Sequence, residues 1–184
     1  MTTTLKVHFI LFFLSIFIAC NDPNYNGDNY VAFDTMDELS HKIIESIKNN
    51  DEQKMLKLLD NNALIFDLLT NAEGDDANKT KAYLMTEEGK RNFSIDQMAQ
   101  KQRINAFFST GLPNQITINK AAFQTIGLEF VHEQPYSENS PAMLQSYQIR
   151  IDNGDKQAYG YDIQVIYWNN KYHLIEAAGF LNKL

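Results

Sequence analysis

The first part of the folded chain carries apolar residues at helical spacing. Between residues 35 and 48 one helical face is apolar, and its members are Met36, Leu39, Ile43, Ile44 and Ile47. Thr35 and Glu38 have the spacing of a capping box, in which the threonine and the glutamate satisfy each other's backbone amides. We therefore expect a helix from Thr35 to about Lys48 that packs through this stripe.

Polar residues then separate this helix from further helical segments. Residues 49–51 end it, and Asn50 with Gln53 has the spacing to cap a second helix, whose apolar residues are Met55, Leu56, Leu58 and Leu59. Residues 71–80 are polar and include Gly74, so we expect a loop there.

A second capping-box spacing, from Ser94 to Gln97, predicts the start of a later helix. This helix carries Met98, Ile104, Phe107 and Phe108, and residues 111–113 contain the glycine and proline that should end it. We expect a neighbouring helix near residues 81–90.

From Ile116 onward the apolar period changes to two, which is typical of strands. Ile126, Leu128 and Phe130 alternate with other residues and predict a strand, followed by a loop over residues 135–141. Further strands are predicted around residues 147–151, 159–167 and 171–178. The result is an α+β domain over residues 35–184, with N-terminal helices on one face of a curved antiparallel meander.

The turns of this meander fix a register that can be tested. A two-residue loop at Asn169 and Asn170 pairs three positions on the apolar face, namely Tyr167 with Tyr172, Val165 with Leu174 and Ile163 with Glu176. A two-residue loop at Asn153 and Gly154 would turn the preceding isoleucines away from that face. We therefore predict a three-residue loop, 152–154, with Gly154 in the left-handed region and Tyr147 opposite Tyr159.

This order of elements resembles the nuclear-transport-factor-like (cystatin-like) superfamily. The resemblance lies in the capped first helix, the break at residues 49–51, the second helix and the closing hairpin around Trp168 and Tyr172. It implies a ligand site in a cone between the sheet and the helices. The superfamily includes isomerase-like and cyclase-like enzymes as well as noncatalytic binding modules, so the fold implies no single activity.

The N-terminal residues predict where in the cell the protein is located. Residues 1–6 carry one lysine, residues 9–19 form an apolar run too short to span a bilayer, and a polar segment follows. Residues 17–20 resemble the lipobox of bacterial lipoproteins, which implies removal of a signal peptide, 1–19, and attachment of palmitate-type acyl chains to Cys20. Residues 20–34, rich in Asn, Asp and Gly, are expected to form a flexible tether.

Composition and charge exclude several classes of protein. The 184 residues include 44% apolar and 21% charged residues, values that are typical of a folded domain rather than a disordered chain. Lys and Arg number 16 against 23 Asp and Glu, so nucleic acid is not an expected partner. The single cysteine excludes an internal disulfide, and no phosphate loop or metal-ligand spacing is present, so no cofactor is expected.

A few groups on the apolar face of the sheet are candidates for a pocket. They are Tyr147, Tyr159, Tyr161, Glu176 and, at the end of the first strand, His132. A carboxylate among tyrosines would have a raised pKa and can act as an acid, a base or a ligand for a polar group. The alternative is that Glu176 and His132 lie at strand ends in water and that the tyrosines belong to the core. Trp168 lies on the opposite face and marks either a protein contact or a satellite apolar cluster.

These observations favour a lipid-anchored protein of the bacterial cell envelope, on its periplasmic or surface side, that acts as a noncatalytic binding module. Its expected partners are the membrane, through the lipid, and a small ligand or an envelope protein. One alternative is a small isomerase- or hydrolase-type enzyme with Glu176 or His132 as base. Another is a structural lipoprotein that forms a homodimer near Trp168.

Overall fold

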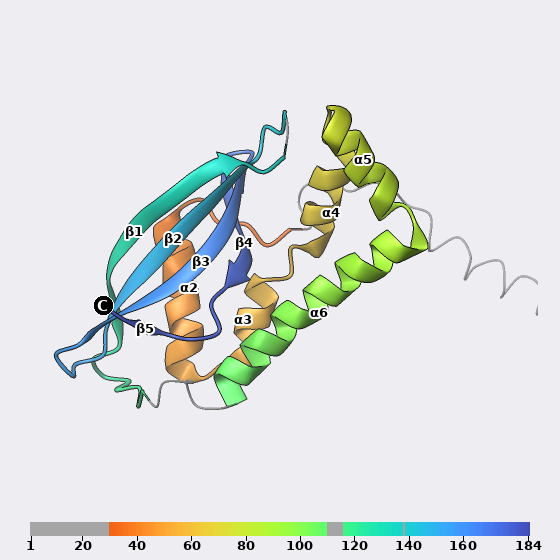
Figure 1. Cartoon of the computed structure of the whole chain (residues 1–184). Coiled ribbons are helices and arrows are strands. Elements are labelled where there is room, and N and C mark those ends of the chain that lie inside the picture. The colour runs from red at the N-terminus through yellow and green to blue at the C-terminus, as the bar shows by residue number, and fades with distance from the viewer. Residues whose placement is uncertain (1–29, 110–115, 138) are drawn as a thin grey trace, which may run out of the picture.

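The computed structural model describes residues 30–109, 116–137 and 139–184 and has the predicted α+β architecture (Figure 1). Its helices are α2 (Met36–Asn49), α3 (Glu52–Leu58), α4 (Asn62–Asn71), α5 (Asp75–Leu84) and α6 (Glu87–Ser109). Its strands are β1 (Gln124–Pro135), β2 (Met143–Asp152), β3 (Ala158–Trp168), β4 (Lys171–Ala177) and β5 (Asn182–Lys183). No described helix is long and apolar enough to cross a membrane.

The first helix begins and ends as its sequence predicts. The Thr35 hydroxyl accepts a hydrogen bond from the Glu38 amide at 3.2 Å, and the apolar stripe of α2 is buried. The predicted cap of α3 is wrong, because Asn50 is already used to end α2 in the left-handed conformation, with φ of 53°. Asp51 caps α3 instead, and its carboxylate accepts from the Lys54 amide at 2.9 Å.

Two predictions for the middle of the chain are corrected. The expected loop over residues 71–80 is mostly helix, since α5 begins at Asp75. Ser94 does not start a helix but lies inside α6, whose first turn is capped by Thr86, the hydroxyl of which accepts from the Gly89 amide at 3.0 Å. The α5–α6 turn requires glycine at position 89, where a Cβ atom would lie 2.0 Å from the Tyr83 carbonyl oxygen. The predicted stop at residues 111–113 lies outside the described residues.

The strands form an antiparallel meander in the order β1-β2-β3-β4, and β5 pairs with β3. At the β2–β3 hairpin the predicted register is wrong: Asp152 pairs with Ala158, and Tyr147 pairs with Ile163 rather than Tyr159. The loop is longer because the Asn153 side chain bonds residues 117–119, accepting from the Asn119 amide at 2.8 Å. Gly154 has the predicted positive φ of 76°. The predicted register differs from the observed one by an even number of residues, so each side chain still lies on the predicted face of the sheet.

The two faces of the sheet pack differently, and we call them the inner and the outer face. The inner face carries Ile149, Tyr161 and Val165, which form the main core with residues of α2, α3 and α6. The outer face carries Ile166 and Trp168 at one end, where α4 forms a smaller apolar cluster. Trp168 therefore belongs to a satellite cluster, one of the two alternatives that the sequence left open.

The edge of β4 that does not pair with β3 is covered by groups from three separate segments. The Asn61 side chain donates to the Leu174 carbonyl at 2.9 Å, and the Gln100 side chain donates to the Ile175 carbonyl. Phe33 and Tyr172 exchange two backbone hydrogen bonds, at 2.9 and 3.0 Å. This edge is therefore closed to pairing with another strand.

Residues 30–34, which we call the N-terminal arm, dock on the domain beside α4. The Tyr30 hydroxyl donates to Asp67, the Val31 carbonyl lies 3.1 Å from Nδ1 of His173, and Asp34 pairs with Lys171. The arm is the described part of the expected tether 20–34, and the folded domain includes it. Residues 20–29, with the predicted lipid site Cys20, lie outside the described residues.

Candidate functional site

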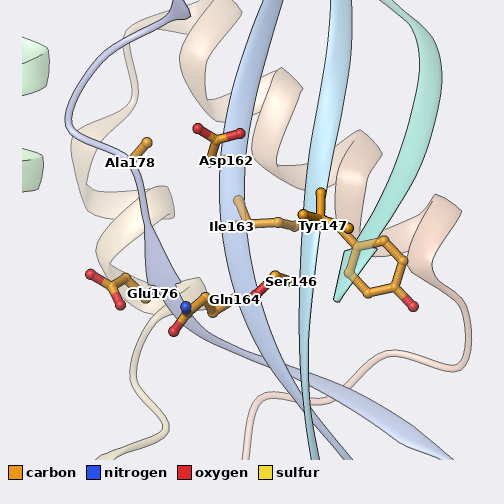
Figure 2. Close-up of a pocket in the computed structure, with 8 residues that line it drawn as sticks. Ser146, Tyr147, Asp162, Ile163, Gln164, Glu176 and Ala178 are labelled. Carbon is orange, nitrogen blue, oxygen red and sulfur yellow. The ribbon is translucent and has the colours of Figure 1, made fainter. Parts of the chain in front are cut away.

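A pocket of about 310 Å³ lies on the outer face of the sheet (Figure 2). It is lined by Val131, Ser146, Tyr147, Asp162, Ile163, Gln164, Glu176 and Ala178. Ser146 pairs with Gln164 across β2 and β3, and Gln164 pairs with Glu176 across β3 and β4. Three neighbouring strands thus place a hydroxyl, an amide and a carboxylate in one row across the sheet.

A β-bulge brings Glu176 to this pocket. The predicted pairs of Tyr167 and Val165 are confirmed, but a register shift then leaves Ile175 without a partner residue in β3. As a result Ile163 pairs with Ala177, and the predicted pairing of Ile163 with Glu176 is wrong. Glu176 therefore lies on the outer face rather than the inner one. Arg103 of α6 donates to Oε1 of Glu176 at 3.0 Å and fixes the carboxylate at the rim.

A second bulge has the same effect on His132. The β1–β2 register shifts between Phe130 and His132, so Phe130 pairs with Tyr147 while His132 pairs with Ser146. His132 is exposed at the β1 end of the row formed by Ser146, Gln164 and Glu176. The two titratable candidates therefore share the outer face, separated by two strands.

The three candidate tyrosines remain on the inner face. Tyr161 is fully buried, its ring centroid lies 5.7 Å from that of Phe107, and its hydroxyl has no hydrogen-bond partner among the described residues. Burial raises the pKa of this hydroxyl strongly. Tyr161 is thus a core residue, which is the alternative that the sequence left open beside a role in the pocket.

Hydrogen bonds hold the hydroxyls of the other two tyrosines. The Tyr159 hydroxyl donates to Asp155, which raises the tyrosine pKa to about 12 and lowers the pKa of the Asp155 carboxyl. The Tyr147 hydroxyl donates to the side chain of Gln145 at 3.0 Å, and burial raises the pKa of Tyr147 to about 12. All three phenols are therefore neutral at physiological pH.

Of the five candidates, Tyr147 and Glu176 line the same pocket, whereas Tyr159, Tyr161 and His132 do not line it. The Tyr147 hydroxyl donates to Gln145. The structure adds Ser146, Asp162 and Gln164, which the sequence did not single out. Asp162 accepts from Gln148 at 2.8 Å and from Asn182 at 3.0 Å, so both of its oxygens are held in place. These residues occupy the polar positions that alternate with apolar ones along the strands. The same alternation is typical of any sheet with one face in water, so it does not mark a site.

The chemistry available in the pocket is hydrogen bonding. The Ser146 hydroxyl and the Gln164 amide can donate and accept, and the Glu176 carboxylate can accept. The described hydrogen bonds include none from Ser146 to a histidine or carboxylate that would activate it as a nucleophile. Among the residues that the structure describes, no group of three or more His, Cys, Asp or Glu side chains could hold a metal ion.

Comparisons with protein-family models, with curated proteins and with solved structures find no match for this chain. The nuclear-transport-factor-like resemblance therefore stays a prediction. It implied a site between the sheet and the helices, whereas the pocket at Ser146 and Gln164 lies on the face away from the inner core.

Proposed function

We propose that the protein is a lipid-anchored module of the bacterial cell envelope that binds its ligand noncatalytically in the outer-face pocket. The observation that carries the binding role is the row of Ser146, Gln164 and Glu176, three hydrogen-bonding groups from three strands around one cavity. A polar row above a partly apolar floor suits a small polar molecule or a polar side chain of an envelope protein.

The noncatalytic role is supported by the partners that already hold the candidate acid and base groups. A small isomerase would need a carboxylate or histidine base within reach of a tyrosine hydroxyl that orients the substrate. Tyr147 and Glu176 line the same pocket, but the Tyr147 hydroxyl donates to Gln145 and the Glu176 carboxylate is engaged by Arg103. The lipid anchor is supported by the leader and by Cys20, the sole cysteine.

Native mass spectrometry of the protein released gently from its own envelope tests both parts. We expect an acyl mass on Cys20, which Cys20→Ser abolishes, and a further mass from a bound molecule. Ser146→Phe should fill the pocket and raise the dissociation constant of the ligand about tenfold or more, a loss of at least about 1.4 kcal/mol in binding. The matched control is Arg150→Phe, an exposed position on the same face that does not line the pocket.

Each part can fail separately. An unmodified Cys20 in the wild-type protein would contradict the lipid anchor. It would not affect the test of the pocket, which depends on the mass of the bound molecule. A bound mass that survives Ser146→Phe, or the absence of any bound molecule from the wild-type protein, would contradict the pocket as a ligand site.

A further inference from the structure

The inner face of the sheet is not buried along its whole length. Toward the end where β1 finishes and β4 begins, it carries four aromatic side chains from four strands and one carboxylate. These residues are Phe130, Glu133, Tyr147, Tyr167 and Tyr172, and we call this set the aromatic end. Phe130 is 53% exposed, Glu133 is exposed and the three tyrosines are partly exposed. The aromatic end is therefore open to a ligand.

The rings of the aromatic end are held in pairs. The ring centroids of Phe130 and Tyr147 lie 5.4 Å apart in an edge-to-face arrangement, and those of Tyr167 and Tyr172 lie 4.8 Å apart. Tyr147 and Tyr172 also pack against the main core. Figure 2 shows the ring of Tyr147 pointing away from Gln164 of the outer-face pocket. Because these rings are already held in place, a ligand that binds them loses little free energy to ordering.

The carboxylate of Glu133 lies among these rings. Its Oε2 accepts from the side-chain amide of Gln145 at 2.7 Å, and Oε1 of Gln145 accepts from the Tyr147 hydroxyl at 3.0 Å. Gln145 is buried, so this chain of hydrogen bonds fixes the carboxylate beside Tyr147. Burial raises the pKa of Tyr147 to about 12 and also raises that of Tyr172, and in each case a neighbouring tyrosine and then Glu133 add to the shift. Glu133 is therefore close to both phenols.

The charge of Glu133 is not balanced within the described part of the chain. Its hydrogen-bond partner is a neutral amide, and no ion pair between described residues includes it. Lys171 at the start of β4 is already paired with Asp34, and the bulge in β1 places His132 on the outer face. No described lysine, arginine or histidine contributes to the pKa shifts of the two phenols. The aromatic end therefore presents a negative charge that a ligand can neutralise.

This combination of groups selects for an organic cation. Aromatic ring faces and a carboxylate both attract a positive charge and both disfavour an anion. A divalent metal ion needs several oxygen ligands, and no group of acidic or histidine side chains among the described residues supplies them. A neutral apolar ligand would cover Glu133 without pairing its charge, which is costly. A quaternary ammonium group fits best, because it carries its charge on an apolar surface and needs no hydrogen-bond acceptor.

We propose that the aromatic end is a second binding site, for a small molecule that carries a quaternary ammonium group. The cation lies against the tyrosine rings, and the Glu133 carboxylate balances its charge. The proposal does not depend on the outer-face pocket, because Glu133, Tyr167 and Tyr172 do not line that pocket. The protein then holds two ligands on opposite faces of one sheet.

Saturation-transfer difference NMR on the full chain in a nonionic detergent tests this site. The probes are choline and 3,3-dimethyl-1-butanol, which have nearly the same shape and differ in charge. We expect choline to bind about tenfold more tightly than the alcohol, or better. Glu133→Gln should weaken choline binding about fivefold or more and leave the binding of the alcohol unchanged, since glutamine keeps an acceptor for the Gln145 amide.

Glu129→Gln is the matched control. Glu129 is an exposed carboxylate on the same strand, but it pairs with Gln148 on the outer face, so its loss should leave choline binding unchanged. Tyr172→Leu removes one ring but keeps an apolar side chain, and it should also weaken choline binding in a protein that still shows its thermal transition. The proposal would be overturned if choline bound no more tightly than the alcohol or did not bind, or if Glu133→Gln and Glu129→Gln had equal effects.

Discussion

The two faces of the β-sheet consist of alternate residues of the same strands, yet they differ in packing and in chemistry. The inner face at Ile149, Tyr161 and Ile163 is buried to 2% exposure or less beneath the helices. The outer face at Ser146, Asp162 and Gln164 is polar and hollowed into a pocket. The difference teaches that the residues that form the core and the residues that line the pocket are separated by a single step along each strand.

The largest expected effect is on the inner face, at Tyr161. Tyr161→Ala should remove about 3 to 5 kcal/mol from the free energy of unfolding, because it leaves a cavity in the core beside Phe107. Urea denaturation of the two proteins measures this loss.

Tyr161→Phe is the matched control, since it removes only the hydroxyl that lacks a partner among the described residues. We expect the free energy of unfolding to be unchanged or to rise by up to about 1 kcal/mol. A large loss in the phenylalanine variant would mean that the hydroxyl is bonded and that the inner face holds a polar site.

A smaller effect is expected where the N-terminal arm covers the outer face, at His173. Burial lowers the pKa of His173 below its usual value of 6.5, so the unfolded chain binds more protons and protonation opposes folding. The stability contributed by the neutral ring is present above the unfolded pKa and is lost as the pH falls through the folded pKa. His173→Asn keeps a donor for the Val31 carbonyl but does not titrate.

Urea denaturation at about pH 7.5 and about pH 5.5 measures this linkage. The wild-type protein should lose more stability on acidification than His173→Asn, and His41→Asn, at an exposed position on α2, should behave like the wild type. Equal losses of unfolding free energy in the wild type and in His173→Asn would show that protonation of His173 does not destabilise the folded protein.

The smallest effect on stability is expected in the open part of the outer face. Gln148→Ala removes an exposed hydrogen bond to Asp162 and should change the free energy of unfolding by less than about 0.5 kcal/mol. A loss above about 1 kcal/mol would show that the polar network stabilises the sheet, which would weaken the distinction between the two faces.

The sequence predicted which strand residues are buried better than it predicted their exact partners. Period-two alternation depends on burial, and Tyr159, Tyr161 and Ile163 are buried as expected even though the β2–β3 register differs. The loop length depends on Asn153 bonding to residues 117–119, a tertiary contact that no local pattern contains.

The candidate site was harder to predict because two bulges decide it. One extra residue at Ile175 and another near Val131 move Glu176 and His132 to the outer face. Neither position carries a glycine or another residue typical of a bulge. The start of α6 was predicted wrongly for a related reason, since Ser94 and Thr86 both have capping chemistry and only the close α5–α6 turn at Gly89 selects between them.

The covered edge of β4 has a consequence for how the chain folds. Its three covering contacts join residues that are 139, 113 and 75 positions apart in the sequence, from Phe33, Asn61 and Gln100. Contacts of such long sequence separation form slowly, because loop closure must come first. The residues that cover the edge of β4 therefore precede it in the chain and reach their places only when β4 has joined the sheet. Until then the strand is open to pairing, so the interval before these contacts form is the one in which the edge is most exposed to aggregation.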